Sequence, residues 1–302
     1  MTILRTPDDR FRNLPGYPFA PHYVSVTDEL RMHYVDETPA LTDGPPETVL
    51  MLHGEPTWSY LYRRMIPPVV KAGYRVVAPD LIGFGKSDKI VEPEAYSYQQ
   101  HVDWMNAFVQ KLDLRHVTLV AQDWGGLIGL RVVADQPDRF ARVSVSNTSL
   151  PTGDHAVSEA FLAWQRFAQT TPVFEVGAIV RGGCMSRPDP AVVAAYDAPF
   201  PDEPYKTAAR LFPALVPTTP DDPASAANRA AWAVLKTWQK PFQTAFSDMD
   251  PITGGADRPF QQLIPGARNQ AHPVIAGAGH FVQEEKAKSG LPLCFSLCSR
   301  TR

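Results

Sequence analysis

The sequence predicts an α/β protein in which a mostly parallel, doubly wound sheet carries an inserted helical cap. Apolar, strand-like runs alternate with helical spacing over residues 1–150, as expected of a parallel sheet with helices on both faces. Residues 151–235 contain short amphipathic pieces and proline-rich joints but no buried strand, and we expect them to form the cap. Strand-like runs return in residues 236–285, which should complete the sheet.

Length and composition bound the class of protein. The 302 residues suffice for one large domain with an insertion, and a chain that is 44% hydrophobic and 20% charged is an ordinary globular one. The net charge of −3 arises from scattered residues of both signs, so we expect neither nucleic acid nor a membrane as a partner. The N-terminus is polar, and no stretch approaches the roughly 20 apolar residues of a membrane helix. We therefore expect a cytoplasmic protein that is a monomer.

Cysteine usage gives no sign of a disulfide framework or a metal site. Cys184, Cys294 and Cys298 are odd in number, and no zinc-like spacing is backed by histidines. We expect free thiols in a reducing compartment, with no metal and no cofactor.

The first half of the chain supplies most of the expected sheet. Alternation over residues 22–26 and 30–35 predicts an antiparallel hairpin at a sheet edge. The apolar runs 47–53 and 75–80 are typical of strands buried on both faces, and a helix over 61–72 should connect them. Helical spacing over 98–112 precedes a further buried strand.

That further strand covers residues 117–122, and the next one covers 142–147. Four helical pieces are expected in the cap, and two later strands follow it at 242–246 and 273–276. The helical pieces are residues 161–169, 191–196, 205–212 and 228–235.

The turn after residue 122 predicts a catalytic carboxylate. Ala121 and Gly125 flank Asp123 between a buried strand and an apolar helix, the pattern of a nucleophile elbow. Serine is the usual residue at such a turn. An aspartate there indicates a covalent alkyl ester rather than an acyl-enzyme. The alternative is a structural aspartate that caps the helix.

Other reactive residues also stand where strands of the expected sheet end. The order nucleophile, acid, histidine of α/β-hydrolases is matched by Asp123, a later aspartate and His280. Of the two candidate acids, Asp250 is favoured over Asp248, because Asp250-Pro251 starts a turn that should aim the side chain back at the sheet end.

The chemistry of these side chains suggests their roles. An ionised Asp123 can displace a leaving group from carbon, His280 can then activate water, and Asp250 can stabilise the imidazolium. Hydrolysis forms an oxyanion that requires backbone N–H donors, for which Glu55 and Trp124 occupy the expected places.

Five motifs carry a resemblance to a known family, namely His53-Gly-Glu-Pro-Thr-Trp-Ser-Tyr60, Pro79-Asp-Leu-Ile-Gly-Phe-Gly-Lys-Ser-Asp88, Gln122-Asp-Trp-Gly-Gly126, Tyr196-Asp-Ala-Pro-Phe-Pro-Asp202 and Gly279-His-Phe-Val-Gln283. With these motifs the chain resembles a haloalkane dehalogenase of the α/β-hydrolase superfamily. The resemblance implies hydrolysis of halogenated alkanes, with water, to a primary alcohol, halide and a proton, a detoxification reaction. It also implies that the indole N–H groups of Trp124 and a cap tryptophan, Trp164, hold the halide, since Trp donates without accepting.

The rest of the cap offers further candidates. Trp232 and Trp238 are expected to serve packing rather than halide binding. Five phenylalanines are candidates for apolar substrate walls, namely Phe84, Phe161, Phe167, Phe174 and Phe200, although core packing is the favoured expectation for most of them.

Three alternatives compete with this interpretation. An epoxide hydrolase would need cap tyrosines as donors, and Tyr196 and Tyr205 are available. A fluoroacetate-type dehalogenase would need an arginine cluster next to the nucleophile, where this chain has Trp124-Gly-Gly. A non-catalytic hydrolase-fold protein is the third, because residues 286–302 form an atypical tail in which Gly290 and Pro292 interrupt the expected closing helix.

Overall fold

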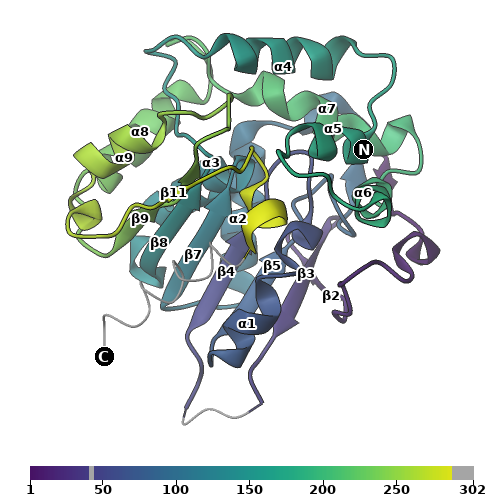
Figure 1. Cartoon of the computed structure of the whole chain (residues 1–302), viewed down its shortest axis with the longest axis horizontal. Helices are drawn as coiled ribbons and strands as arrows, with labels where there is room; N and C mark the ends of the chain where they lie inside the picture. The colour runs from purple at the N-terminus through teal and green to yellow at the C-terminus, as the bar shows by residue number, and fades with distance from the viewer. Residues whose placement is uncertain (41–43, 288–302) are drawn as a thin grey trace.

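The computed structural model describes residues 1–40 and 44–287, and a seven-stranded sheet lies at its centre (Figure 1). The strand order is β2-β3-β5-β4-β7-β8-β9. The pairs β2–β3 and β3–β5 are antiparallel, and all other neighbours are parallel, which confirms the mostly parallel sheet and its edge hairpin. The strands are β2 (His22–Ser25), β3 (Arg31–Glu37), β4 (Thr48–Leu52), β5 (Arg75–Pro79), β7 (Val117–Gln122), β8 (Phe140–Ser146) and β9 (Phe242–Thr244).

The burial of the central strands explains why their sequences are continuous apolar runs. Every residue of β4 and β7 is buried, because helices cover both faces of the sheet there. The edge strand β2 instead alternates half-buried and exposed residues. The predicted strand periodicities are therefore confirmed at both the centre and the edge.

Helices cover both faces of the sheet, as right-handed crossovers require. From β4 the chain passes through α1 (Ile66–Lys71) to β5 on one side, whereas α3 (Trp124–Asp135) leads from β7 to β8 on the other. Helix α2 (Tyr98–Lys111) packs against α3. The expected helix over 61–72 is split, since a 3-10 turn (Ser59–Tyr62) precedes α1.

The described residues between β8 and β9 contain helices and no strand. Figure 1 shows α4 and α7 beyond one end of the sheet and α8 beside α3 and α9. Helix α5 has no counterpart among the expected helical pieces, because Gly177 and Gly182 obscure its periodicity. The helices are α4 (Glu159–Thr170), α5 (Val176–Gly182), α6 (Pro190–Asp197), α7 (Thr207–Leu211) and α8 (Ser225–Leu235); α9 (Asp257–Leu263) follows β10.

Two further sheets have two strands each. Strands β1 (Ile3–Leu4) and β6 (Lys89–Ile90) are antiparallel, and β10 (Phe246–Ser247) pairs in parallel with β11 (Val274–Ile275). The expected strand over 273–276 is thus present but lies outside the main sheet. Its parallel pairing with β10 brings the ends of these two strands together.

A buried ion pair joins the core to the C-terminal part of the described chain, and a tyrosine of the insertion bonds to the same carboxylate. Arg63 donates two hydrogen bonds to the carboxylate of Glu284, at 2.6 and 2.8 Å, and the Tyr196 hydroxyl of α6 donates a third at 2.7 Å. Residues 282–287 are helical, whereas most of the atypical tail, residues 288–302, lies outside the described residues. A search of the described helices finds none long and apolar enough to span a membrane.

Candidate active site

Asp123 occupies a strained turn between β7 and α3. Its φ is 52° and its ψ is −128°, a region that side chains other than glycine rarely adopt. The turn is held by the backbone, since Asp123 N–H donates to Asn147 O at 3.0 Å and Asp123 O accepts the Thr148 hydroxyl at 2.7 Å. This geometry is that of a nucleophile elbow, which presents one side chain at the end of the sheet.

Two glycines around the elbow are required by close packing. A Cβ on Gly125 would collide with the carbonyl of Leu52, and a Cβ on Gly54 would collide with the carboxylate of Asp123. Only glycine therefore lets α3 begin against β4 while the chain after β4 passes directly beside the Asp123 side chain.

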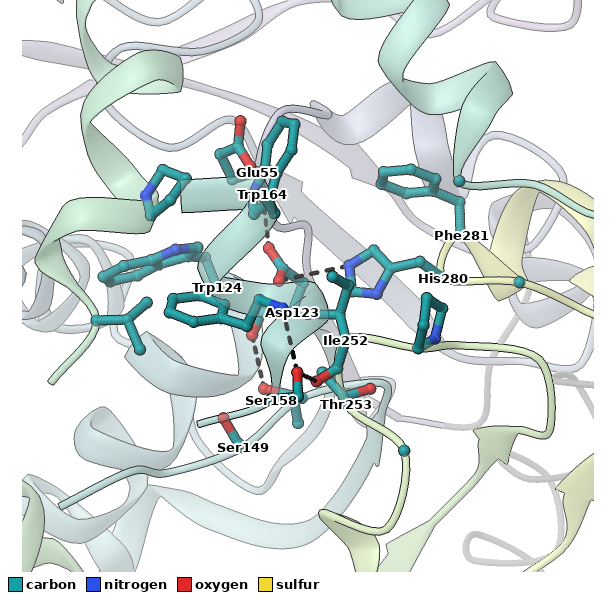
Figure 2. A pocket seen from close by; sticks show the side chains of 18 of the residues that line it. Glu55, Asp123, Trp124, Ser149, Ser158, Trp164, Ile252, Thr253, His280 and Phe281 are labelled. Atoms are coloured by element: carbon teal, nitrogen blue, oxygen red, sulfur yellow. Dashed lines mark hydrogen bonds and ion pairs between the residues drawn. The ribbon is translucent and has the colours of Figure 1, made fainter. Parts of the chain in front are cut away.

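The carboxylate of Asp123 has different partners on its two oxygens (Figure 2). Glu55 N–H donates to Oδ1 at 2.7 Å, and His280 Nε2 lies 3.4 Å from Oδ2. One oxygen is thus held by a backbone amide and the other faces an imidazole. No hydrogen bond from the Trp124 N–H to this carboxylate is found in the described chain.

His280 lies between two carboxylates. Its Nδ1 is 2.9 Å from Oδ2 of Asp250, and because a carboxylate only accepts, the proton resides on Nδ1. Burial disfavours the charge on His280, but attraction to Asp250 and the contact with Asp123 outweigh burial and raise the pKa of His280 to about 10. The resting site therefore favours an imidazolium flanked by two anions.

Asp250 is fixed by hydrogen bonds as well as by charge. The Ile252 N–H donates to Oδ1 at 2.9 Å, and the Thr253 hydroxyl donates to Oδ2. Burial opposes ionisation, but His280 and these donors lower the pKa of Asp250 to about 2. Asp248, the other candidate acid, is exposed and accepts a hydrogen bond from the Gly277 N–H at 2.8 Å.

Glu55 places a buried carboxyl next to Asp123. Its residue is 4% exposed, and its Oε1 has no hydrogen-bond partner. Burial and the negative charge of Asp123 raise the pKa of Glu55 well above its ordinary value, against smaller opposing effects of His280 and Trp164. A neutral Glu55 adds no second negative charge beside the carboxylate of Asp123.

Trp124 and Trp164 both line the cavity into which Asp123 opens. Figure 2 shows them on the side of Asp123 away from His280. Trp124 begins α3 and packs against Tyr98 and Phe212, whereas Trp164 comes from α4 of the insertion. The indole of Trp232 instead donates to Leu150 O at 2.8 Å, and neither Trp232 nor Trp238 lines the cavity.

The cavity has a volume of about 1120 Å³ and is lined by both the sheet ends and the insertion. Of the five candidate phenylalanines, Phe161 and Phe167 line it, whereas Phe84, Phe174 and Phe200 do not, in agreement with the expectation that most of the five serve the core. Those three are core residues, because each is buried against other aromatic or insertion side chains.

The tyrosines that an epoxide hydrolase would need lie elsewhere. Neither Tyr196 nor Tyr205 lines the cavity, and the hydroxyl of Tyr196 is engaged by Glu284. Among the described residues that line the cavity there is also no lysine or arginine. The described lining of this pocket therefore offers no lysine or arginine to bind a carboxylated substrate.

Gln122 and Asn147 contact His280 or its neighbour Gly279, although no motif assigns them a role. Gln122 Nε2 lies 3.0 Å from His280 Nε2. Asn147 Nδ2 donates to the carbonyls of Gly279 and His280 at 3.0 and 2.9 Å. The only signal in the sequence is their position at the ends of adjacent strands, where side chains converge.

Comparisons with known proteins agree with this geometry. Residues 47–178 match the family model of the alpha/beta hydrolase fold. The chain is 58% identical over 292 residues to a haloalkane dehalogenase of Psychrobacter cryohalolentis, covering 95% of each chain. It is 54% identical over 289 residues to one of Mycobacterium marinum, covering 94% of this chain and 96% of the relative.

A solved structure is similar over nearly the whole chain. It is the tetrameric haloalkane dehalogenase DpaA from Paraglaciecola agarilytica, with a TM-score of 0.89 and 38% identity, covering 98% of this chain and 97% of that one. High identity over almost the full length, together with an aspartate elbow facing a histidine, leaves one assignment. The chain belongs to the haloalkane dehalogenase family, hydrolases of the α/β-hydrolase fold that act on carbon–halide bonds.

Proposed function

We propose that this chain hydrolyses halogenated alkanes through a covalent ester on Asp123. The observation that carries the proposal is the placement of the Asp123 carboxylate, which opens into an apolar cavity with Glu55 N–H on one oxygen and His280 beside the other. An aspartate nucleophile attacks carbon directly and needs no base to be activated.

In the first step, a carboxylate oxygen of Asp123 attacks the carbon that bears the halogen. A C–O bond forms, and the electron pair of the carbon–halogen bond leaves with the halide. We assign the indole N–H groups of Trp124 and Trp164 as halide donors, because both rings line the cavity beside Asp123. An indole stabilises the departing anion without bringing an acceptor into an apolar pocket.

In the second step, His280 Nε2 takes a proton from water, and the resulting hydroxide attacks the carboxyl carbon of the ester. The oxyanion of the tetrahedral intermediate is assigned to the backbone N–H groups of Glu55 and Trp124. Glu55 N–H already donates to Oδ1 in the resting site. Collapse passes the hydroxyl proton of the intermediate to the leaving alkoxide, releases the alcohol and restores the Asp123 carboxylate. His280 keeps the proton taken from water and so regains the protonated form of the resting site, and the one proton released per cycle is the one His280 loses to solvent after the ester has formed.

The charge on Asp123 determines when His280 is available as a base. The two anions Asp250 and Asp123, acting against burial, raise the pKa of His280, so the resting imidazole favours its protonated form. Forming the ester neutralises Asp123 and removes one of the two anions. The affinity of His280 for its proton then falls, and the imidazole becomes available as a base when the ester exists. Asp250 remains to stabilise the imidazolium.

A single turnover in ¹⁸O-labelled water tests the covalent route. With enzyme in excess over a 1-bromoalkane, the first alcohol should carry unlabelled oxygen from Asp123, and the Asp123 carboxylate should gain ¹⁸O. Labelled alcohol in that first turnover would instead mean that water attacks the substrate directly. Bromide release in the same reaction reports the overall activity.

Cellular location and assembly belong to the same proposal. We propose that the protein acts as a monomer in the cytoplasm and serves detoxification of halogenated compounds. The monomer is the part of this proposal that can be measured directly. Light scattering of the purified protein tests it, and a tetramer, the state named for the relative from Paraglaciecola agarilytica, would contradict it.

A further inference from the structure

The cavity that contains Asp123 is larger than a short haloalkane requires. Its volume of about 1120 Å³ lies just above the roughly 300–1,000 Å³ typical of sites for drug-sized ligands. A two- or three-carbon substrate would occupy only the part next to Asp123, Trp124 and Trp164. The remaining space is walled mainly by apolar side chains, namely Leu127, Phe161, Ile179, Val216, Ile252 and Phe281.

The cavity also opens onto an exposed apolar rim. Eight large apolar side chains are exposed among the described residues, and four of them line this one cavity. Singly exposed apolar residues are common, but a group around one opening marks a binding surface. The rim consists of Phe167, Val173, Met185 and Met249, with exposed fractions of 43%, 61%, 55% and 48%.

The rim is assembled from segments that are distant in sequence. Phe167 lies on α4, and Val173 follows that helix. Met185 follows α5, and Met249 follows β10. Met249 directly precedes Asp250, so the apolar surface is continuous with the segment that holds the acid partner of His280. Residues of both the insertion and the core therefore surround the opening, and the cavity connects this rim to Asp123.

We propose that the preferred substrates are long-chain 1-haloalkanes, whose halogen-bearing carbon lies at Asp123 and whose alkyl tail crosses the cavity to the Phe167–Val173–Met185–Met249 rim. The inference rests on the proposed dehalogenase activity and adds the length and polarity of the substrate. An uncharged tail is favoured because the charged or titratable lining residues within the described chain are carboxylates and histidines, with no lysine or arginine. Glu175 also lines the cavity, and its carboxylate would repel a substrate tail that ends in a carboxylate.

The first test is a series of 1-bromoalkanes from three to ten carbons, with bromide release as the readout. Burying one methylene is worth roughly four-fold in kcat/KM, equivalent to ~0.8 kcal/mol. We expect kcat/KM to rise by up to that factor per added carbon until the tail reaches the rim. A profile that is flat or falls beyond four carbons would overturn the inference. Activity on the short members shows that such a result does not arise from loss of the dehalogenase itself.

Two valines of nearly equal exposure provide a matched pair of variants. Val173 on the rim is 61% exposed, and Val274 on β11, outside the cavity, is 66% exposed. In Val173→Asn, we expect the ratio of kcat/KM for 1-bromodecane to that for 1-bromopropane to fall roughly four- to fifteen-fold, the effect of one or two lost methylene contacts. In Val274→Asn the ratio should stay within two-fold of the unmodified protein.

Three results would overturn the assignment of the rim. The first is an unchanged ratio in both Val173→Asn and the double variant Val173→Asn/Met185→Gln. The second is an equal fall in Val173→Asn and Val274→Asn. The third is a change in oligomeric state on size exclusion with the chain-length profile unaltered, because the rim would then be a contact between protein molecules. Absence of bromide release from every substrate contradicts the proposed function instead, so the two failures are distinguishable.

Discussion

The backbone N–H of Glu55 donates a 2.7 Å hydrogen bond to Oδ1 of Asp123 in the resting site. This amide lies after β4 and Asp123 lies after β7, and the two strands are neighbours in the sheet. Parallel strands end at the same edge, so the donor is positioned by the sheet rather than by a flexible loop. The same amide can follow the carboxyl oxygen as it becomes an ester and then an oxyanion.

Replacing Asp250 with asparagine should slow hydrolysis of the ester more than its formation. Asparagine keeps the size of the side chain but removes the negative charge that stabilises the His280 imidazolium. We expect kcat to fall by roughly 10³–10⁴, as for other triads that lose the acid. Steady-state halide release and mass spectrometry during turnover should show slow turnover with accumulated alkyl enzyme.

Asp248→Asn is the matched control, since Asp248 is exposed and the one hydrogen bond found for its side chain among the described residues comes from the Gly277 N–H. Its kcat should remain within about two-fold of the unmodified protein, as for most surface substitutions. The assignment of Asp250 as the acid fails when Asp250→Asn keeps kcat within ten-fold, or when the two variants behave alike.

Trp164→Phe should weaken halide binding while keeping an aromatic ring in α4. A hydrogen bond to an anion contributes about 1.5–3 kcal/mol, so kcat/KM should fall roughly 10- to 150-fold. Bromide titration followed by tryptophan fluorescence should show the same loss of affinity. Trp232→Phe serves as the comparison, because its indole donates to Leu150 O outside the cavity. Unchanged bromide affinity in Trp164→Phe would remove Trp164 from the halide site.

Glu55→Gln should stabilise the protein at neutral pH and not at acidic pH. The pKa of Glu55 is raised in the folded protein by burial and by Asp123. Above the ordinary pKa of glutamate, near 4.3, the folded protein therefore binds more protons than the unfolded one, and its stability falls as pH rises. Glutamine is neutral at every pH and lacks this penalty. At pH 8 we expect the Tm of the variant to exceed that of the unmodified protein by about 2 °C or more, equivalent to ~1 kcal/mol.

The difference should shrink toward zero as the pH falls well below about 4.3, where glutamate is largely protonated in both states. A Tm difference that is independent of pH would show that Glu55 is ionised in the folded protein. The backbone donor to Asp123 is retained in Glu55→Gln, so halide release should stay within about ten-fold of the unmodified rate.

Glu284→Gln should destabilise the whole protein. The side chains of Arg63 and Glu284 are both 2% exposed, and removing one partner leaves an uncompensated buried charge. We expect a loss of about 3–5 kcal/mol in the free energy of unfolding from urea titration. Glu203→Gln removes a carboxylate whose side chain is 52% exposed and which pairs with Lys206 and Arg210, and it should cost at most about 1 kcal/mol. Equal losses in the two variants would contradict a structural role for the buried pair.

Local pattern predicted the central sheet and the order of the reactive residues. The apolar runs of β4 and β7 are buried throughout, and small residues around Asp123 identify the elbow without knowledge of tertiary contacts. Asp250 could be preferred over Asp248 from the Asp-Pro turn alone, and the structure places Asp250 beside His280. These features depend on residues that are adjacent in sequence.

Features that depend on packing between distant segments were not predictable. Which of the five candidate phenylalanines line the cavity depends on such packing, since Phe84 contacts Phe200 and Phe212 and all three are buried. Gln122 and Asn147 reach His280 across more than 130 residues of sequence, and nothing in their neighbours indicates it. The sequence did not predict helix α5, because Gly177 and Gly182 obscure its apolar periodicity.

The covalent ester on Asp123 is the central claim, and mass spectrometry of His280→Phe during reaction with a 1-bromoalkane tests it most directly. Phenylalanine leaves Asp123 able to attack carbon but removes the base that hydrolyses the ester, so the protein should gain the mass of one alkyl group and release one equivalent of bromide. The double variant Asp123→Asn/His280→Phe should gain no mass and release no bromide. An adduct that persists in the double variant, or bromide release by His280→Phe without an adduct on Asp123, would contradict the account.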